Sequence, residues 1–233
     1  MNFRFLILAC CIFAVTAISV NAQSFDANFM RCIAHNETRG ITDPKVAAAK
    51  TNDSKYTGIY QMGVNYVGGY LCSNWADLKG MDAYQDWSKC DFKGTLSKNA
   101  KFNIKSYADF TTGPNAVAAQ NYIMTRNSEA TWRTIQRDPV LSKYIDQTVN
   151  GIKMTKETMV AMAHLTGPGG LKKTVQGGIE ADKNGSTTIG YASCVNACLA
   201  GSTAPCDMKT GSTSGTGTAT EALKSVCDTI NAK

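Results

Sequence analysis

Apolar residues recur at helical spacing shortly after the N-terminal region. Phe25, Phe29 and Ile33 lie four residues apart, so a helix places them on one face. The next position on this face is Glu37, and Gly40 stands three residues later, where it can end the helix. The pattern predicts a helix that buries an apolar face and carries a carboxylate in its last turn.

The position of this carboxylate has a chemical consequence. Burial penalises the charged form of a carboxyl group and raises its pKa, which is what a general acid needs near neutral pH. Glu37 is therefore a candidate catalytic acid. A second interpretation stays open, in which Glu37 faces solvent or pairs with Arg31 or Arg39.

Helical patterns return in the second half of the chain. Gly113-Pro114 precedes a helix predicted over residues 116–135, and Pro139 starts another over 139–149. Thr155 can cap a further helix that ends at the Gly167 to Gly170 turn, and residues 171–175 form a short last one. With little strand signal, the sequence predicts a mainly α domain in which a cleft between helices forms the ligand site.

The intervening segments are more polar. Residues 41–55 are predicted to be a loop, and residues 71–109 an irregular insertion whose Trp75 and Trp87 either stack on sugars or pack beneath the loop. From Asn184 onward Gly, Ser, Thr and Cys dominate. Residues 209–220 are typical of a linker, and 222–232 can form a final helix held by Cys227. We therefore divide the chain at 193/194, into a helical domain over 23–193 and a disulfide-stapled, Cys-rich tail over 194–233.

The first 22 residues are typical of a secretory signal. Arg4 is followed by an apolar run from Phe5 to Val20, with small residues before a predicted cleavage after Ala22. Removal of Arg4 lowers the formal net charge from +6 to +5. We expect a periplasmic or secreted protein without stable membrane insertion. Its mild positive charge suits an anionic cell wall, and its scattered basic residues do not form a nucleic-acid module.

Seven of the nine cysteines lie beyond the predicted signal. An exported chain with this many cysteines is expected to form disulfides, and an odd number leaves one thiol free or paired between chains. Cys72 with Cys90 closes one plausible loop. The last four cysteines can connect the tail to itself: Cys194, Cys198, Cys206 and Cys227. A zinc site made of His164 and three tail cysteines is a weaker alternative, and we expect no metal and no cofactor.

A second segment carries groups suited to a sugar ligand. Residues 56–63 read Tyr-Thr-Gly-Ile-Tyr-Gln-Met-Gly. Glycine allows a backbone to approach a ligand closely, while tyrosine and glutamine offer flat faces and hydrogen-bonding groups. The candidate substrate-binding residues here are Gly58, Tyr60, Gln61 and Met62.

A third segment, Ala-His-Leu-Thr-Gly-Pro-Gly-Gly over residues 163–170, completes a pattern. A helical Glu, then Gly-x-Tyr-Gln-Met-Gly, then Ala-His-Leu-x-Gly resembles the lysozyme-like superfamily, in the lytic transglycosylase and phage tail lysozyme branch. The resemblance covers roughly residues 25–193. It implies that Glu37 is the catalytic acid, that the second segment lines the saccharide cleft and that His164 faces this cleft. Many lytic transglycosylases have Ala-Tyr-Asn-Ala-Gly in the third segment, so the role of that Tyr does not transfer directly to His164.

The resemblance implies cleavage of the MurNAc-GlcNAc bond of peptidoglycan glycan strands. Glycosidases usually need two carboxylates, and the others near Glu37 in sequence are Asp43 and Asp53 in a polar segment. A lytic transglycosylase needs only one, because the substrate's 2-acetamido group supplies the second function. Two alternatives stay open: a hydrolytic lysozyme in which Asp43 or Asp53 places a water, and a non-catalytic peptidoglycan-binding accessory protein. The sequence identifies no secretion-system or envelope partner.

Overall fold

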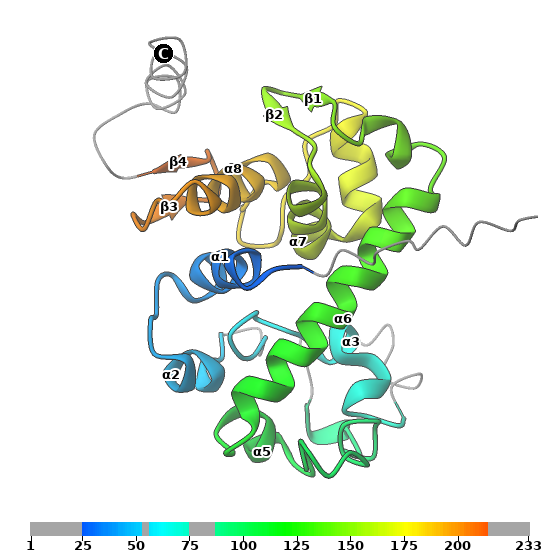
Figure 1. The fold of residues 1–233 in the computed structure, drawn as a ribbon, viewed down its shortest axis with the longest axis vertical. Coiled ribbons are helices and arrows are strands. Elements are labelled where there is room, and N and C mark those ends of the chain that lie inside the picture. Colours follow the sequence, from blue (N-terminus) through cyan, green and yellow to red (C-terminus); the bar gives the residue numbers. More distant parts are fainter. Residues whose placement is uncertain (1–24, 53–55, 75–86, 214–233) are drawn as a thin grey trace, which may run out of the picture.

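The computed structural model describes residues 25–52, 56–74 and 87–213, and these form a mainly helical domain (Figure 1). The predicted signal, Trp75 and the predicted helix over 222–232 with Cys227 lie outside the described residues. Among the described helices, none combines the length and the apolar character needed to cross a membrane.

The first predicted helix is α1, Ala27–Thr38. The Asp26 side chain caps its start by accepting a 2.7 Å hydrogen bond from the backbone N–H of Phe29. Phe29 and Ile33 are fully buried, and the Phe25 ring packs on Phe29 with centroids 4.7 Å apart. The predicted apolar face is confirmed.

The helix ends through two residues in the left-handed region. Arg39 has a φ of 54° and Gly40 a φ of 79°, and the Gly40 N–H donates to the carbonyl oxygen of His35 at 2.8 Å. The chain then enters α2, Pro44–Ala49. The prediction of a loop over 41–55 is wrong here, because the Asp43 side chain caps the helix and Pro44 occupies its first position.

The long helix α6, Ala116–Arg137, runs diagonally through the domain (Figure 1). It confirms the helix predicted over 116–135. Around it lie α2, α3 (Val64–Val67), α5 (Tyr107–Thr111) and α7 (Lys156–Val175). Two short 3₁₀ helices, η1 (Gly68–Tyr70) and η2 (Trp87–Lys89), complete this half. Trp87 is buried against Tyr107 and Phe110, so it packs in the core and offers no face to a sugar.

The helix predicted after Pro139 is wrong. Its residues form a 3₁₀ turn, η3 (Leu141–Tyr144), and an antiparallel hairpin of β1 (Thr148–Val149) and β2 (Ile152–Lys153). Asn150 and Gly151 join the two strands with φ angles of 51° and 78°, as a type I′ turn requires. The Asn-Gly pair favours this turn over a continued helix.

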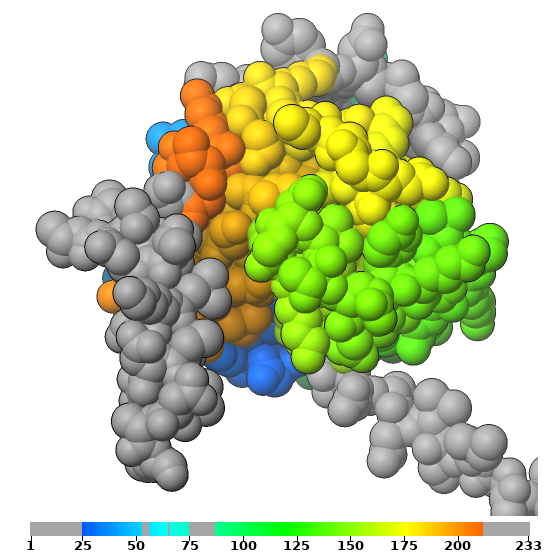
Figure 2. All heavy atoms as spheres, turned by 90° about the horizontal axis from the view of Figure 1, so that it is seen from above, coloured from blue at the N-terminus to red at the C-terminus, as the bar shows by residue number. Residues whose placement is uncertain are grey.

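The last two helices close the domain. In α7, Lys156–Val175, Thr155 caps the start as predicted and Gly167 interrupts the helix with a φ of 73°. The next helix is α8, Thr188–Leu199, which packs against both α1 and α7. The predicted domain boundary at 193/194 falls inside α8. The space-filling view shows β3 (Cys206–Asp207) and β4 (Ser212–Thr213) beside α8 (Figure 2).

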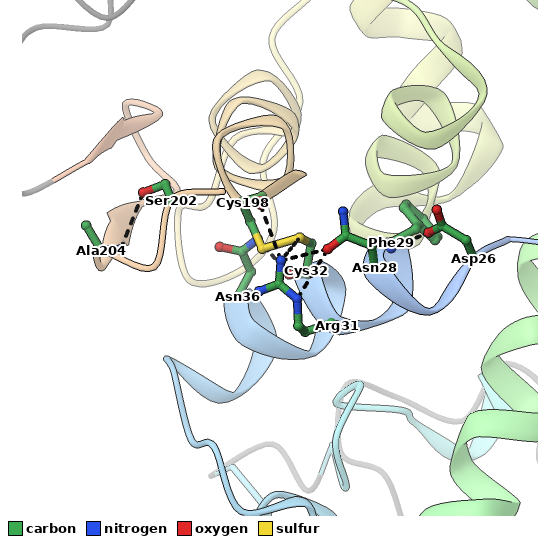
Figure 3. The surroundings of a disulfide bond; sticks show 9 residues. All are labelled: Asp26, Asn28, Phe29, Arg31, Cys32, Asn36, Cys198, Ser202 and Ala204. Atoms are coloured by element: carbon green, nitrogen blue, oxygen red, sulfur yellow. Dashed lines mark hydrogen bonds between the residues drawn. A yellow bond between two sulfur atoms is a disulfide. The ribbon is translucent and has the colours of Figure 1, made fainter. Parts of the chain in front are cut away.

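Within the described residues, three disulfides cross-link the chain. The predicted Cys72–Cys90 bond is confirmed, and Cys194–Cys206 joins α8 to β3. The third bond, Cys32–Cys198, joins α1 to α8 across 166 residues, and the sequence did not predict this pair (Figure 3). Since the sulfurs of Cys194, Cys198 and Cys206 are all in disulfides, the alternative of a zinc site built on these thiolates is wrong.

Candidate functional site

Glu37 and His164 meet in the interior although 127 residues separate them in sequence. Glu37 lies in the last turn of α1, and His164 lies on α7 before the Gly167 interruption. The His164 Nε2 atom is 3.3 Å from Glu37 Oε1. The His164 side chain is 6% exposed and the Glu37 side chain is 15% exposed, so the carboxylate keeps limited access to solvent.

Tyr191 on α8 is the second partner of Glu37. Its hydroxyl donates a 2.6 Å hydrogen bond to Glu37 Oε1. Tyr191 is fully buried, and this burial, reinforced by the Glu37 charge, raises the pKa of the phenol well above its ordinary value. The phenol therefore stays protonated and acts as a permanent donor to the carboxylate.

The orientation of His164 is fixed by Tyr66 on α3. The Tyr66 hydroxyl lies 3.3 Å from His164 Nδ1, and the two rings meet edge to face with centroids 5.3 Å apart. Burial raises the pKa of the Tyr66 phenol. The Tyr66 hydroxyl also lies 3.1 Å from Met124 Sδ, to which it can donate its one hydrogen, so the direction of the His164–Tyr66 contact depends on the tautomer of the imidazole.

The two oxygens of the Glu37 carboxylate therefore differ. Oε1 accepts from Tyr191 and faces His164, whereas Oε2 has no hydrogen-bond partner among the described residues. Asymmetric support of this kind fixes the carboxylate plane and leaves one oxygen free to exchange a proton with a ligand.

The predicted saccharide segment forms a tight turn. Thr57 and Met62 exchange backbone hydrogen bonds at 3.0 and 2.8 Å, and Gly58 has a φ of 88°. A Cβ atom at Gly58 would lie 2.3 Å from the Gln120 side-chain oxygen, so this position excludes any larger residue. Packing against Gln120 therefore explains why a glycine stands at position 58.

The side chains of this turn point in different directions. Met62 is buried in the core, and Tyr60 is 3% exposed with its hydroxyl donating to Asn121 Oδ1 at 2.7 Å. Gln61 is partly exposed, and its Nε2 donates to the carbonyl oxygen of Gly58 at 2.9 Å. The role of these residues in substrate binding stays a prediction, and Gln61 is the most accessible of them.

A groove of about 1090 Å³ is lined by residues of α1, of α6 and of the segments before and after α8. Its lining includes Tyr60, Asn121 on α6, and Asn36 and Arg39 on either side of Glu37. Glu37 and His164 themselves are not among the described residues that line it. The structure therefore brings Glu37 and His164 together, and it places Tyr60 in an adjacent groove that reaches the end of the same helix.

Sequence reasoning did not identify Tyr191 or Tyr66. Tyr191 lies 154 residues from Glu37 and Tyr66 lies 98 residues from His164, and pairing over such separations leaves no local trace in the sequence. The available signal for Tyr191 was the apolar run after the Thr187 cap, which indicates a buried helix where we expected the start of a tail.

No group of three or more His, Cys, Asp or Glu side chains in the described part of the chain is placed to hold a metal ion. No family model matches the sequence, and neither the curated proteins nor the solved structures contain a significant match.

Proposed function

We propose that this chain is an exported, lysozyme-like enzyme that cleaves the MurNAc-GlcNAc bond of peptidoglycan as a lytic transglycosylase. The observation that carries the proposal is the environment of Glu37: one carboxylate at a helix end, with Tyr191 and His164 on one oxygen and the other oxygen free. The order of the three sequence segments, which resembles this family, supports the same conclusion.

In this mechanism Glu37 works first as an acid. A proton on Oε2 passes to the glycosidic oxygen while the bond to the anomeric carbon breaks. The substrate's 2-acetamido oxygen stabilises the oxocarbenium-like centre that forms. Tyr191 supports the resulting carboxylate through Oε1, because its hydrogen bond is stronger to a charged acceptor.

Glu37 then works as a base. Its carboxylate removes the proton from the sugar's own 6-hydroxyl, and that oxygen attacks the anomeric carbon. The product carries a 1,6-anhydro end, Glu37 regains its proton and no water is consumed.

The surroundings of the other acidic residues favour this reaction over hydrolysis. The Asp43 carboxylate accepts from the Lys45 N–H at 2.8 Å and caps α2, so it is engaged in the local fold. The partners of the Glu37 carboxylate among the described residues are a phenol and an imidazole. Asp53 lies outside the described residues, which keeps the hydrolytic lysozyme as the alternative.

Mass spectrometry of digested peptidoglycan tests the proposal. A transglycosylase gives muropeptides with anhydro ends, each lighter by one water than the corresponding product of hydrolysis. Reducing ends would identify a hydrolase instead. Intact glycan strands would leave only a binding role. The three disulfides suit an oxidising compartment such as the periplasm, where this substrate is located.

A further inference from the structure

The groove beside α1 has a positively charged lining. Arg31, His35 and Arg39 follow one another at four-residue spacing, so they line the groove from the same face of the helix. Lys209 lines it from the segment after α8. Among the described residues of the lining, three side chains are basic and one, Asp207, is acidic.

The Asp207 carboxylate is engaged within its own turn. Its Oδ1 atom accepts from the Lys209 N–H at 2.9 Å, and its Oδ2 atom accepts from the Thr210 hydroxyl at 3.1 Å. No ion pair joins this carboxylate to a basic side chain in the described part of the chain. The arginines of α1 are therefore left to interact with a ligand.

The Arg31 guanidinium is held in place by the protein (Figure 3). Its Nη2 atom donates to Asn28 Oδ1 at 2.7 Å and to the Cys198 carbonyl oxygen at 3.4 Å, and its Nε atom donates to the same Asn28 oxygen at 3.3 Å. Nη1 has no hydrogen-bond partner within the described residues. A side chain that is already ordered loses little entropy when it binds an anion.

Arg39 offers a second guanidinium at the end of the helix. Its side chain is exposed and makes no hydrogen bond or ion pair with other described residues. At the helical rise per residue, Arg31 and Arg39 lie about 12 Å apart along the helix. An extended peptide covers this distance in about four residues. Because guanidinium groups bind carboxylates through paired N–H donors, the spacing suits a short, extended peptide that carries several carboxylates.

The rest of the lining suits a peptide better than a sugar. Ala34, Ile41 and Val117 are half-buried and offer aliphatic surface to a ligand. The Phe and Tyr side chains of the described lining are Phe25, which is 6% exposed, and Tyr60, which is 3% exposed. Neither of them presents an open ring face on which a sugar can stack.

We propose that this groove binds the peptide stem of peptidoglycan, with Arg31 and Arg39 on the carboxylates of the stem. Each such stem is a short peptide with free carboxylates, and it is attached to a MurNAc of the glycan strand. Asn36 and Arg39, on either side of Glu37 in sequence, belong to the groove lining, so a stem bound there lies beside the helix end that carries the proposed acid. The identity of the ligand rests on the function proposed above, whereas the binding of an acidic peptide does not.

Arg31→Gln, Arg39→Gln and the double variant remove the charges and keep polar side chains. Arg137→Gln is the matched control, because Arg137 is an exposed arginine in the last turn of α6 and does not line the groove. Thermal unfolding followed by circular dichroism verifies that each variant is folded. Arg39→Gln keeps the proposal testable if loss of the Arg31 contacts disturbs the fold.

The first measurement is an NMR titration with the synthetic stem tetrapeptide L-alanyl-γ-D-glutamyl-meso-diaminopimelyl-D-alanine at low salt. Saturable binding to the unmodified protein is expected. Each single variant should weaken binding roughly two- to fivefold, as expected for an exposed ion pair, and the double variant should weaken it further. Arg137→Gln should bind like the unmodified protein. Absence of saturable binding, or an unchanged affinity in the double variant, overturns the proposal.

Poly(glycerol phosphate) is the second probe, because guanidinium groups also bind phosphates. If this polymer saturates the protein and the stem peptide does not, the groove recognises a phosphate polymer and the proposal is wrong. Weaker binding of the polymer than of the peptide supports the proposal.

The last measurement compares cleavage of intact peptidoglycan with cleavage of glycan strands from which an amidase has removed the stems. The unmodified protein is expected to have a lower KM on intact strands, and the double variant should lose most of this preference. Equal KM values on both substrates for the unmodified protein contradict the proposal. If the unmodified protein cleaves neither substrate, the proposed function fails, and the peptide titration still decides whether the groove binds an acidic peptide.

Discussion

The Tyr191 hydroxyl donates a 2.6 Å hydrogen bond to the Glu37 carboxylate, and the two residues are 154 positions apart in the chain. The bond connects α1 with α8, the same two helices that the Cys32–Cys198 disulfide joins covalently. The site and the stability of the domain therefore depend on one interface. Substitutions that remove only the hydrogen bond or only the disulfide test the two contributions separately.

The Tyr191 hydrogen bond is expected to contribute directly to turnover. Tyr191→Phe removes the hydroxyl and keeps the buried ring. A hydrogen bond to a charged acceptor is worth about 1.5–3 kcal/mol, so kcat on peptidoglycan should fall by about tenfold or more. Tyr122→Phe, on the exposed side of α6, should have no effect. Equal turnover in the two variants would show that Tyr191 does not support the acid.

The Cys32–Cys198 bond is expected to contribute more to stability than either of the other two disulfides between described residues. It closes a loop with a sequence separation of 166, against 12 for Cys194–Cys206. On the loop-entropy model, removing the long-range bond by a double Cys→Ala substitution costs roughly 5 kcal/mol, and removing the short-range bond costs about 3 kcal/mol. Urea unfolding of both variants measures the difference. The same loss in each would contradict the loop-entropy explanation.

Gln120 is expected to be the most sensitive polar residue of α6. Its fully buried side chain accepts from the Ile59 N–H at 2.7 Å and donates to the carbonyls of Ala48 and Phe110 at 3.1 and 2.8 Å. Gln120→Leu leaves these three backbone groups unpaired, at about 1–3 kcal/mol each. The melting temperature should therefore fall sharply.

The matched control is Gln136→Leu, an exposed glutamine on the same helix, which should leave the melting temperature nearly unchanged. A similar melting temperature for the two variants would mean that water or local movement satisfies the groups that Gln120 releases.

Local signals were sufficient for much of the helical structure. The four-residue spacing of Phe25, Phe29 and Ile33 identified α1, and Thr155 and Gly167 marked the start and the interruption of α7. In both cases the deciding physics acts within a few residues along the chain. The same holds for Cys72–Cys90, where a short separation favours the pair.

Two errors came from local signals that were read incompletely. Asp43-Pro44 is a helix start as well as a turn, and it begins α2. Asn150-Gly151 is a strong hairpin signal, but the apolar residues before it have helical spacing. In each case the sequence allowed two structures, and the backbone preference of one pair of residues decided between them.

The partners of Glu37 come from distant parts of the chain, where local signals do not help. The sequence singled out Glu37 from its place on an apolar face, and His164 from its motif. It gave no indication that Tyr191 and Tyr66 would complete the cluster, because these contacts arise from the packing of α8 and α3 against distant helices. The Cys32–Cys198 pairing was missed for the same reason: we expected Cys198 to pair within the tail, and no local signal near Cys32 indicates a partner 166 residues away.

Glu37→Gln is the decisive substitution. The amide keeps the size of the side chain and still accepts the Tyr191 hydrogen bond, but it has no proton to transfer. Cleavage of peptidoglycan should therefore fall by roughly 10²–10⁴-fold, the range attributed to general acid catalysis. The melting temperature should hold, because a buried ionisable group is replaced by a neutral one of the same shape.

The matched control is Glu129→Gln on α6, where the carboxylate pairs with Arg126 at 3.4 Å near the surface. An ion pair of this kind contributes little to stability, so this variant should retain both turnover and melting temperature. If Glu37 has only a structural role, the opposite result is expected for Glu37→Gln. Loss of the contact with His164 would then lower the melting temperature, and cleavage would continue. A Glu37→Gln protein that melts early yet still cleaves the wall would remove Glu37 from the mechanism, and the reaction would then require a different acid.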